Sequence, residues 1–195
     1  MTPAVPLVDI AGILLAAGGS RRFGTNKLLQ PLPSGMPLAV AAARALLQAV
    51  PNSVAVIRPG DIALSAALAE IGLQCVENPA AEMGMGASLA VGVNAAAEAS
   101  GWLIALADMP WVESATKAAV AERLRLGAPL VAPLYQRQRG HPVGFSWQWR
   151  ERLANLRGDS GAKSLIEEFR EQLELLPVAD AGVLRDVDFP GDLQK

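Results

Sequence analysis

Two arginines and a lysine lie in a short glycine-containing segment, LAAGGSRRFGTNK, at residues 15–27. Glycine lets a backbone turn sharply and approach a ligand closely, and exposed backbone N–H groups bind anionic oxygens. The side chains of Arg21, Arg22 and Lys27 add positive charge to the same segment. These residue types predict a cradle for a polyphosphate; the alternative is a glycine-rich surface turn with solvated arginines.

The glycine spacing separates this segment from two familiar phosphate-binding loops. A dinucleotide fingerprint requires G-x-G-x-x-G, whereas Gly18 and Gly19 are adjacent. A P-loop requires a lysine directly after its last glycine, whereas two residues separate Gly24 from Lys27. The segment therefore predicts phosphate-binding chemistry on a different backbone.

An aspartate ends a later apolar run. The sequence LIALADMP, residues 103–110, reads as a buried strand that ends at Asp108. Mg²⁺ prefers hard oxygen ligands and typically binds through one or two carboxylates plus substrate phosphates. Asp108 is therefore a candidate metal ligand, although an aspartate after a strand is also a common turn residue or helix cap.

Short apolar runs alternate with helical stretches along the chain. The expected strands cover residues 10–16, 54–57, 73–77, 102–107 and 130–132, and the expected helices cover 37–50, 61–71, 87–99 and 114–126. Continuously apolar strands are typical of a sheet buried on both faces, and the alternation predicts parallel strands covered by helices. We expect one domain over residues 1–195, a three-layer α/β/α sandwich with a mostly parallel, Rossmann-like sheet.

The pattern changes after residue 133. Residues 135–140 are polar and predict a loop or hairpin, residues 147–156 and 160–170 predict two more helices, and residues 173–178 a late strand. In open α/β sheets, ligands bind beyond the carboxyl ends of the strands. The segments that follow strands are therefore the candidate binding segments: residues 17–27, 58–61, 78–88 and 108–110.

One of those segments enters a helix. Gly86 at the expected helix start would leave N–H groups uncovered, and Ser88 would offer a hydroxyl in the first turn. A helix N-terminus favours phosphate or another electronegative group. A simple capped helix explains the same residues.

Composition limits the class of protein. The chain has 195 residues, 51% of them hydrophobic, and a formal net charge of −2, which argues against disorder and against a nucleic-acid partner. No run approaches the ~18 apolar residues of a membrane span, and the first residues lack the charged start of a signal peptide. The single cysteine, Cys75, has no disulfide partner. We expect a cytoplasmic protein without membrane contact.

Six motifs together resemble one family. The first loop, L-A-A-G-x-S-x-R-F-G-x-x-K, resembles the signature of molybdenum-cofactor nucleotidyltransferases, the MobA/MocA-like branch of the nucleotide-diphospho-sugar transferase fold. Five further segments are similar to family patterns: NP with GMGASL (78–89), DMP (108–110), RGHPV (139–143), GDSGAK (158–163) and DVDFPGDL (186–193). Lys163, Phe189 and Gly191 depart from the usual arginine, threonine and glutamate.

The resemblance implies a site for each ligand. It implies that Arg22, Lys27 and Asp108 are catalytic and that Asp108 and Asp188 hold Mg²⁺, with Asp186 as the alternative second ligand. It implies nucleotide contacts from the first loop and two later residues: Leu15, Ala16, Ala17, Gly18, Gly19, Arg22, Lys27, Asn78 and Ser88. On the acceptor side it implies His141, Pro142 and Asp159.

The resemblance also implies the reaction. A nucleoside monophosphate moves from its triphosphate to the phosphate of a molybdopterin-type acceptor, and pyrophosphate leaves. An anionic phosphate needs no base, so we expect His141 to contact the acceptor or to hydrogen-bond within its loop. In this family the third loop position tends to be alanine in cytidylyltransferases and glycine in guanylyltransferases; Ala17 therefore favours CTP.

Three alternatives stay open. The protein could be a guanylyltransferase, or a nucleotidyltransferase of the same fold that acts on a sugar or polyol phosphate. It could also be a non-catalytic chaperone that delivers cofactor to a molybdenum hydroxylase. Lys27 and Asp108 are both present, which favours an enzyme, and such a hydroxylase would be a possible client in either case.

Overall fold

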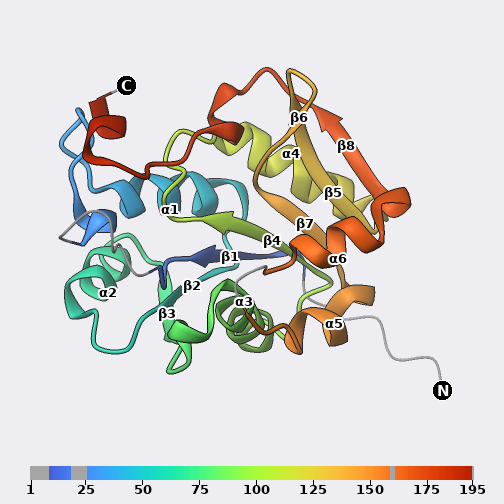
Figure 1. Ribbon diagram of the computed structural model, residues 1–195, viewed down its shortest axis with the longest axis horizontal. Helices are drawn as coiled ribbons and strands as arrows, with labels where there is room; N and C mark the ends of the chain where they lie inside the picture. Colours follow the sequence, from blue (N-terminus) through green and yellow to red (C-terminus); the bar gives the residue numbers. More distant parts are fainter. Residues whose placement is uncertain (1–8, 19–25, 159–160, 195) are drawn as a thin grey trace.

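The computed structural model describes residues 9–18, 26–158 and 161–194 (Figure 1). The strands are β1 (Ala11–Leu15), β2 (Ser53–Ile57), β3 (Gln74–Glu77), β4 (Gly101–Leu106), β5 (Leu130–Tyr135), β6 (Gln138–Arg139), β7 (Val143–Ser146) and β8 (Leu173–Pro177). The α-helices are α1 (Leu38–Ala49), α2 (Ile62–Ala69), α3 (Met85–Ala95), α4 (Ser114–Arg125), α5 (Arg150–Ala154) and α6 (Lys163–Glu168).

These strands form one mixed, mostly parallel sheet in the order β3-β2-β1-β4-β7-β5-β6, and β8 also pairs with β5. The four strands β1 to β4 run parallel, with β1 between β2 and β4. Their carboxyl ends therefore lie at the same edge of the sheet. This confirms the expected α/β class and places the segments after β1, β2 and β4 side by side.

Strand β7 differs from the expectation. Residues 143–146 were not expected to form a strand, yet they run antiparallel between β4 and β5. Gly144 interrupts the apolar run there, and a Cβ at this position would lie only 2.9 Å from Leu124 Cδ1 of α4. Helix α4 thus packs so closely on β7 that position 144 must be a glycine. Because glycine breaks the apolar pattern, this strand was not evident from the sequence.

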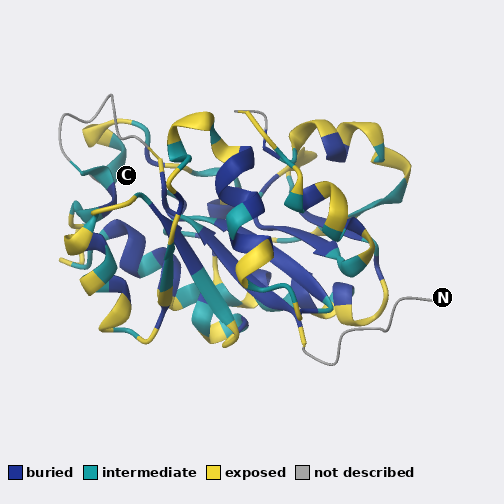
Figure 2. Ribbon diagram, turned by 90° about the horizontal axis from the view of Figure 1, so that it is seen from below, coloured by how far each residue is buried: buried dark blue, intermediate teal, exposed yellow. Residues whose placement is uncertain are grey.

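Helices cover both faces of the sheet. One apolar cluster joins the sheet to α1, α2 and α4, and a second joins it to α3, α5 and α6. In Figure 1, α1 and α4 lie above the central strands and α3 below them, and Figure 2 shows those strands buried between the helices. Trp102 of β4 is fully buried, and its indole N–H donates to Ala96 O at 3.0 Å.

Local signals set some helix ends and fail at others. Asp61 caps α2, as expected, because its carboxylate accepts from Leu64 N at 3.3 Å. The segment 147–156 begins as a 3₁₀ turn (Trp147–Trp149) before α5. In the described part of the second expected helix, α6 ends at Glu168, and a 3₁₀ turn (Arg170–Gln172) follows it. Across the described ranges, no helix is both long and apolar enough to cross a membrane.

Helix α3 packs closely on the sheet at Gly92. A Cβ there would lie 2.5 Å from Ile13 Cγ2 and 3.1 Å from Val56 Cγ2, both in buried strands. We expect Gly92→Ala to lower the free energy of unfolding by about 1–2 kcal/mol, because overpacking outweighs alanine's higher helix propensity.

Chemical denaturation would measure this difference, with Gly191→Ala as the control. A Cβ at Gly191 would meet nothing within 4 Å, so this variant should match the wild type within about 0.5 kcal/mol. Equal stability of the two variants would contradict the close packing of α3.

Candidate active site

A cleft of about 430 Å³ opens at the carboxyl ends of β1, β2 and β4. It is lined by the end of β1 and the start of the first loop, by the segment after β3, and by single residues from other strand ends and helices. These residues are Leu15, Ala16, Ala17, Gly18, Lys27, Leu28, Arg58, Ala81, Glu82, Gly84, Met85, Ser88, Leu106 and Asp108. The cleft therefore lies where the sequence placed the candidate binding segments.

Lys27 is the meeting point of the charged groups. Its Nζ donates to Asp108 Oδ2 at 3.0 Å and to Val187 O at 2.6 Å, and it lies 3.9 Å from Asp188 Oδ1. The Lys27 side chain is mostly buried, and those of Asp108 and Asp188 are partly exposed. Residues from three distant parts of the chain thus meet at one cation.

The C-terminal segment reaches this point through the backbone. Val187 N donates to Asp108 O at 2.9 Å, which fixes residues 186–188 beside the loop after β4. Burial raises the pKa of Asp186, and the charges of Asp188 and Asp108 raise it further. The charges of Asp108 and Asp188 thus act on Asp186 as well.

The described start of the first loop is held by an arginine that the predicted site did not include. Arg58, directly after β2, donates from Nε to Ala17 O at 2.9 Å and lies 3.9 Å from Glu82 across the cleft. Gly18 is exposed, and a Cβ there would meet nothing within 4 Å. The signal for Arg58 was its place at a strand's carboxyl end, within the 58–61 segment.

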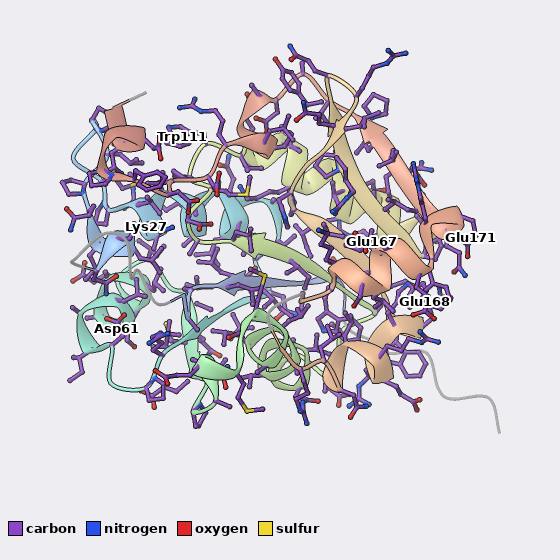
Figure 3. The ribbon with its side chains drawn as sticks, viewed as in Figure 1. Lys27, Asp61, Trp111, Glu167, Glu168 and Glu171 are labelled. Carbon is purple, nitrogen blue, oxygen red and sulfur yellow. The ribbon has the colours of Figure 1, made fainter. Side chains whose placement is uncertain are left out.

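Asn26 fixes the other end of the first loop. Its Nδ2 donates to Asp61 Oδ2 at 3.0 Å, and its Oδ1 accepts from Leu28 N at 3.2 Å. One carboxylate, that of Asp61, thus caps α2 and anchors the turn that carries Lys27. Figure 3 shows Lys27 and Asp61 at the same end of the molecule, with Trp111 nearby.

The segment after β3 supports the cleft differently from the expectation. Asn78 is buried, donates to Ser88 Oγ at 3.0 Å, and accepts from Ala80 N at 2.9 Å. Of this pair, Ser88 lines the cleft. The expectation of an uncovered N–H at Gly86 was wrong, because this N–H donates to Gly158 O at 2.9 Å.

His141 lies near the charged group but is bonded into its loop. Its backbone N–H donates to Val183 O at 3.0 Å, and its Nδ1 is buried without a hydrogen-bond partner among the described residues. Burial lowers the pKa of His141 to about 4; Arg139 adds to this effect, and Asp108 opposes it. His141 is therefore neutral at physiological pH, and the adjoining Pro142 is buried.

Three predicted site residues lie outside the described residues: Gly19, Arg22 and Asp159. Among the described predictions, the structure brings together Leu15 to Gly18, Lys27, Ser88 and Asp108 around the cleft. Asp188 joins them through Lys27, and Asn78 through Ser88. The described part of the site therefore combines a lysine paired with carboxylates and the small and polar residues that line the cleft.

Asp108 and Asp188, which come from two separate segments, are suitable ligands for a divalent cation that also binds substrate oxygens. Within residues 9–18, 26–158 and 161–194, no group of three or more His, Cys, Asp and Glu side chains could hold a metal by itself. Mg²⁺ needs no such cage, since it keeps water ligands and binds one or two carboxylates plus phosphates. The pair Asp108 and Asp188 fits that ligand set.

Comparison with known proteins identifies the family. A sequence profile of the MobA-like NTP transferase domain matches residues 12–174. The chain belongs to this family. It is therefore a nucleotidyltransferase of the MobA-like fold, and the profile covers the first loop, β4 with the following Asp108, and the His141 segment. A search of proteins with curated descriptions found no match.

Solved structures agree with this assignment. Rv0371c from Mycobacterium tuberculosis is 30% identical, with a TM-score of 0.82 over 95% of each chain. Its manganese complex is 28% identical, with a TM-score of 0.77 over 95% of this chain and 96% of that one. Molybdopterin-guanine dinucleotide biosynthesis protein A from Archaeoglobus fulgidus shares the fold at 16% identity, with a TM-score of 0.65 over 94% of each chain.

The buried imidazole of His141 predicts a pH-dependent stability. In the unfolded chain His141 takes up a proton near pH 6.5, but in the native protein only near pH 4. The native state is therefore destabilised as pH falls through this window, by up to about 1.4 kcal/mol per pH unit. We expect the stability of His141→Gln to lack this dependence on pH.

Urea denaturation of both proteins at several values between pH 4 and pH 8 would test this. Above pH 7 the free energies of unfolding of the two proteins should differ by a constant, and below pH 6.5 that of the wild type should fall more steeply. A constant difference over the whole range would show that folding does not lower the pKa of His141.

Proposed function

We propose that this protein is a molybdenum cofactor cytidylyltransferase, which transfers CMP from CTP to the phosphate of a molybdopterin-type acceptor. The observation that carries the proposal is the meeting of Lys27, Asp108 and Asp188 beside the first loop, at the edge of the cleft. The family signature in that loop and the motifs of the acceptor side support the same reaction.

In the proposed reaction, an acceptor phosphate oxygen attacks the α-phosphorus of CTP. The new P–O bond forms as the bond to the β-phosphate oxygen breaks, and pyrophosphate leaves. An anionic nucleophile already exists at neutral pH, and the neutral His141 is not required as a base. Catalysis then consists of positioning and charge neutralisation, as in other phosphoryl transfers.

The first loop and the residues beside it are proposed to hold the nucleotide. Lys27 neutralises triphosphate oxygens, with Arg22 and the backbone of Gly18 and Gly19 on the same phosphates. Backbone N–H groups suit this role because they bind anions at fixed positions. Ser88, oriented by Asn78, lines the same cleft and is proposed to contact the nucleotide.

Asp108 and Asp188 are the proposed ligands of Mg²⁺, which would neutralise triphosphate oxygens when bound. The manganese complex of Rv0371c, at 28% identity, supports a divalent ion in this family. We favour Asp188 over Asp186 as the second ligand, because Asp188 Oδ1 lies 3.9 Å from the Lys27 Nζ that also contacts Asp108. The neutral His141, with Pro142 and Asp159, is proposed to contact the acceptor.

The metal role of Asp108 predicts a loss of turnover without a loss of fold. Asp108→Asn keeps the side chain's shape but removes the charge, and the Lys27 ammonium retains Val187 O and Asp188. We expect pyrophosphate release from CTP, Mg²⁺ and acceptor to fall at least about 100-fold, with an unchanged circular dichroism spectrum.

Asp9→Asn is the matched control, because Asp9 is a carboxylate in an ion pair with Arg125 on the surface. It should keep full activity. Unchanged turnover in Asp108→Asn would remove Asp108 from the metal site, and no turnover in the wild type with any nucleotide would favour the non-catalytic chaperone.

The methyl group of Ala17 predicts the choice of base. Ala17 is nearly buried at the cleft wall and is held there by Arg58, so its methyl group narrows the space for a base. We expect faster pyrophosphate release with CTP than with GTP, and a shift of the CTP/GTP ratio toward GTP by about tenfold in Ala17→Gly.

The same assay with each nucleotide, at equal Mg²⁺ and acceptor, gives the ratio of kcat/KM values. A wild-type preference for GTP would replace the cytidylyltransferase proposal with a guanylyltransferase. Turnover only with sugar or polyol phosphates would replace the acceptor but keep the nucleotide site.

A further inference from the structure

A buried polar cluster lies outside the cleft and has no role in the proposed reaction. Asp180, Thr116 and Lys117 are each 5% exposed or less. Asp180 Oδ2 accepts from Thr116 Oγ1 at 2.8 Å and from Glu113 N at 2.9 Å, and its Oδ1 accepts from Gly182 N at 2.8 Å. One carboxylate thus satisfies three donors from two segments.

The second charge in the cluster is a cation. Lys117 of α4 donates from Nζ to Val112 O at 2.6 Å. Burial lowers its pKa to about 8, and the charge of Asp180 opposes this decrease. Burying a lysine is costly unless its charge is compensated; here the ammonium bonds to the carbonyl of Val112, in the loop that Asp180 also contacts through Glu113 N.

The cluster joins two segments that run to the proposed active site. One is the loop after β4, residues 108–113, which begins at Asp108 and ends where α4 starts. The other is residues 178–188, which we call the C-terminal strap; it leaves β8 and ends at Asp188. Asp180 joins the far end of the loop to the near end of the strap.

Contacts continue between these segments up to the carboxylates. A Cβ at Gly182 would overlap Trp111 O, so the backbones touch there. The Arg185 guanidinium lies 4.1 Å from the centre of the Trp111 ring. Val187 N then donates to Asp108 O at 2.9 Å. The strap is therefore fastened to the loop at both ends and in the middle.

We propose that Asp180, held by Thr116 Oγ1 and Glu113 N, is a positioning residue that fixes the C-terminal strap so that Asp188 stays beside Asp108. This inference rests on the proposed function, since it explains how two carboxylates far apart in sequence are kept at one site. Asp180 touches neither substrate nor metal; it acts through the backbone of the strap.

The main variant is Asp180→Asn. An amide keeps the shape of the carboxyl but sets an NH₂ group against one of the N–H donors, which breaks at least one bond. We expect amides of residues 183–188 to exchange hydrogen at least about tenfold faster. We also expect Mn²⁺ affinity, followed by the electron spin resonance of free Mn²⁺, to fall about tenfold.

Kinetics separates positioning from loss of binding. For Asp180→Asn at saturating Mg²⁺, kcat should fall about tenfold, while KM for CTP changes less than about twofold because the first loop is unaltered. Glu174→Gln is the matched control: it removes a C-terminal carboxylate that pairs with Arg123 of α4 and leaves the strap untouched. It should behave as the wild type in all three measurements.

Thr116→Val provides a milder variant, because it removes one of the three bonds to Asp180 and retains those from Glu113 N and Gly182 N. It should show smaller changes in the same direction even if Asp180→Asn does not fold. Unchanged exchange in the strap, or faster exchange with unchanged Mn²⁺ affinity and kcat, would overturn the proposal. A wild type that neither binds Mn²⁺ nor turns over would instead reject the proposed function, and the exchange data would still decide whether Asp180 holds the strap.

Discussion

Two carboxylates from distant parts of the chain meet at one ammonium group, and the rest of the site depends on that contact. Asp108 and Asp188 would repel each other without a cation between or beside them. Lys27 supplies the cation and also bonds to Val187 O, so it binds the C-terminal strap as well as the charges. A divalent ion bound at this place would neutralise the same two carboxylates.

The sheet makes this meeting possible. Parallel pairing of β1 with β4 puts the first loop and Asp108 at the same edge, and pairing of β1 with β2 adds Arg58 from the neighbouring strand. The third contribution, Asp188, comes from no central strand. It is carried by a strap that leaves β8 and is bonded along the loop after β4. The parallel strands therefore position Lys27 and Asp108, and packing of the C-terminal segment positions Asp188.

The sequence was sufficient for features set by local chemistry. The apolar runs located β1 to β5, Asp61 marked the start of α2, and the loop motifs located Lys27 and Asp108, which the structure places in contact. Features set by contacts across the fold were missed. Gly144 hid a strand because it makes room for α4. Gly86 N is covered by Gly158 O, a partner that no local pattern indicates.

The same limit explains why polar residues were harder to assign than apolar ones. Arg58 carried no motif, and its role follows only from the acceptor it finds in Ala17 O. Asn78 was expected at the nucleotide, but its amide is used on Ser88 and Ala80 N. Asp180 and Lys117 gave no signal at all. A side chain's donors and acceptors are known from sequence, but their partners are known only from the fold.

The residues that line the cleft divide the proposed chemistry into two groups. Ala17 and Ser88 are small, and Arg58 holds the backbone of Ala17, whereas Lys27 and Asp108 bring an ion pair to the same cleft. In the proposed reaction, a change at Ala17 would alter the fit of a base without changing the charges of the second group. The second group is bonded to the strap, because Lys27 Nζ donates to Val187 O and Val187 N donates to Asp108 O. Base preference and catalytic charge would then be set by separate parts of one fold.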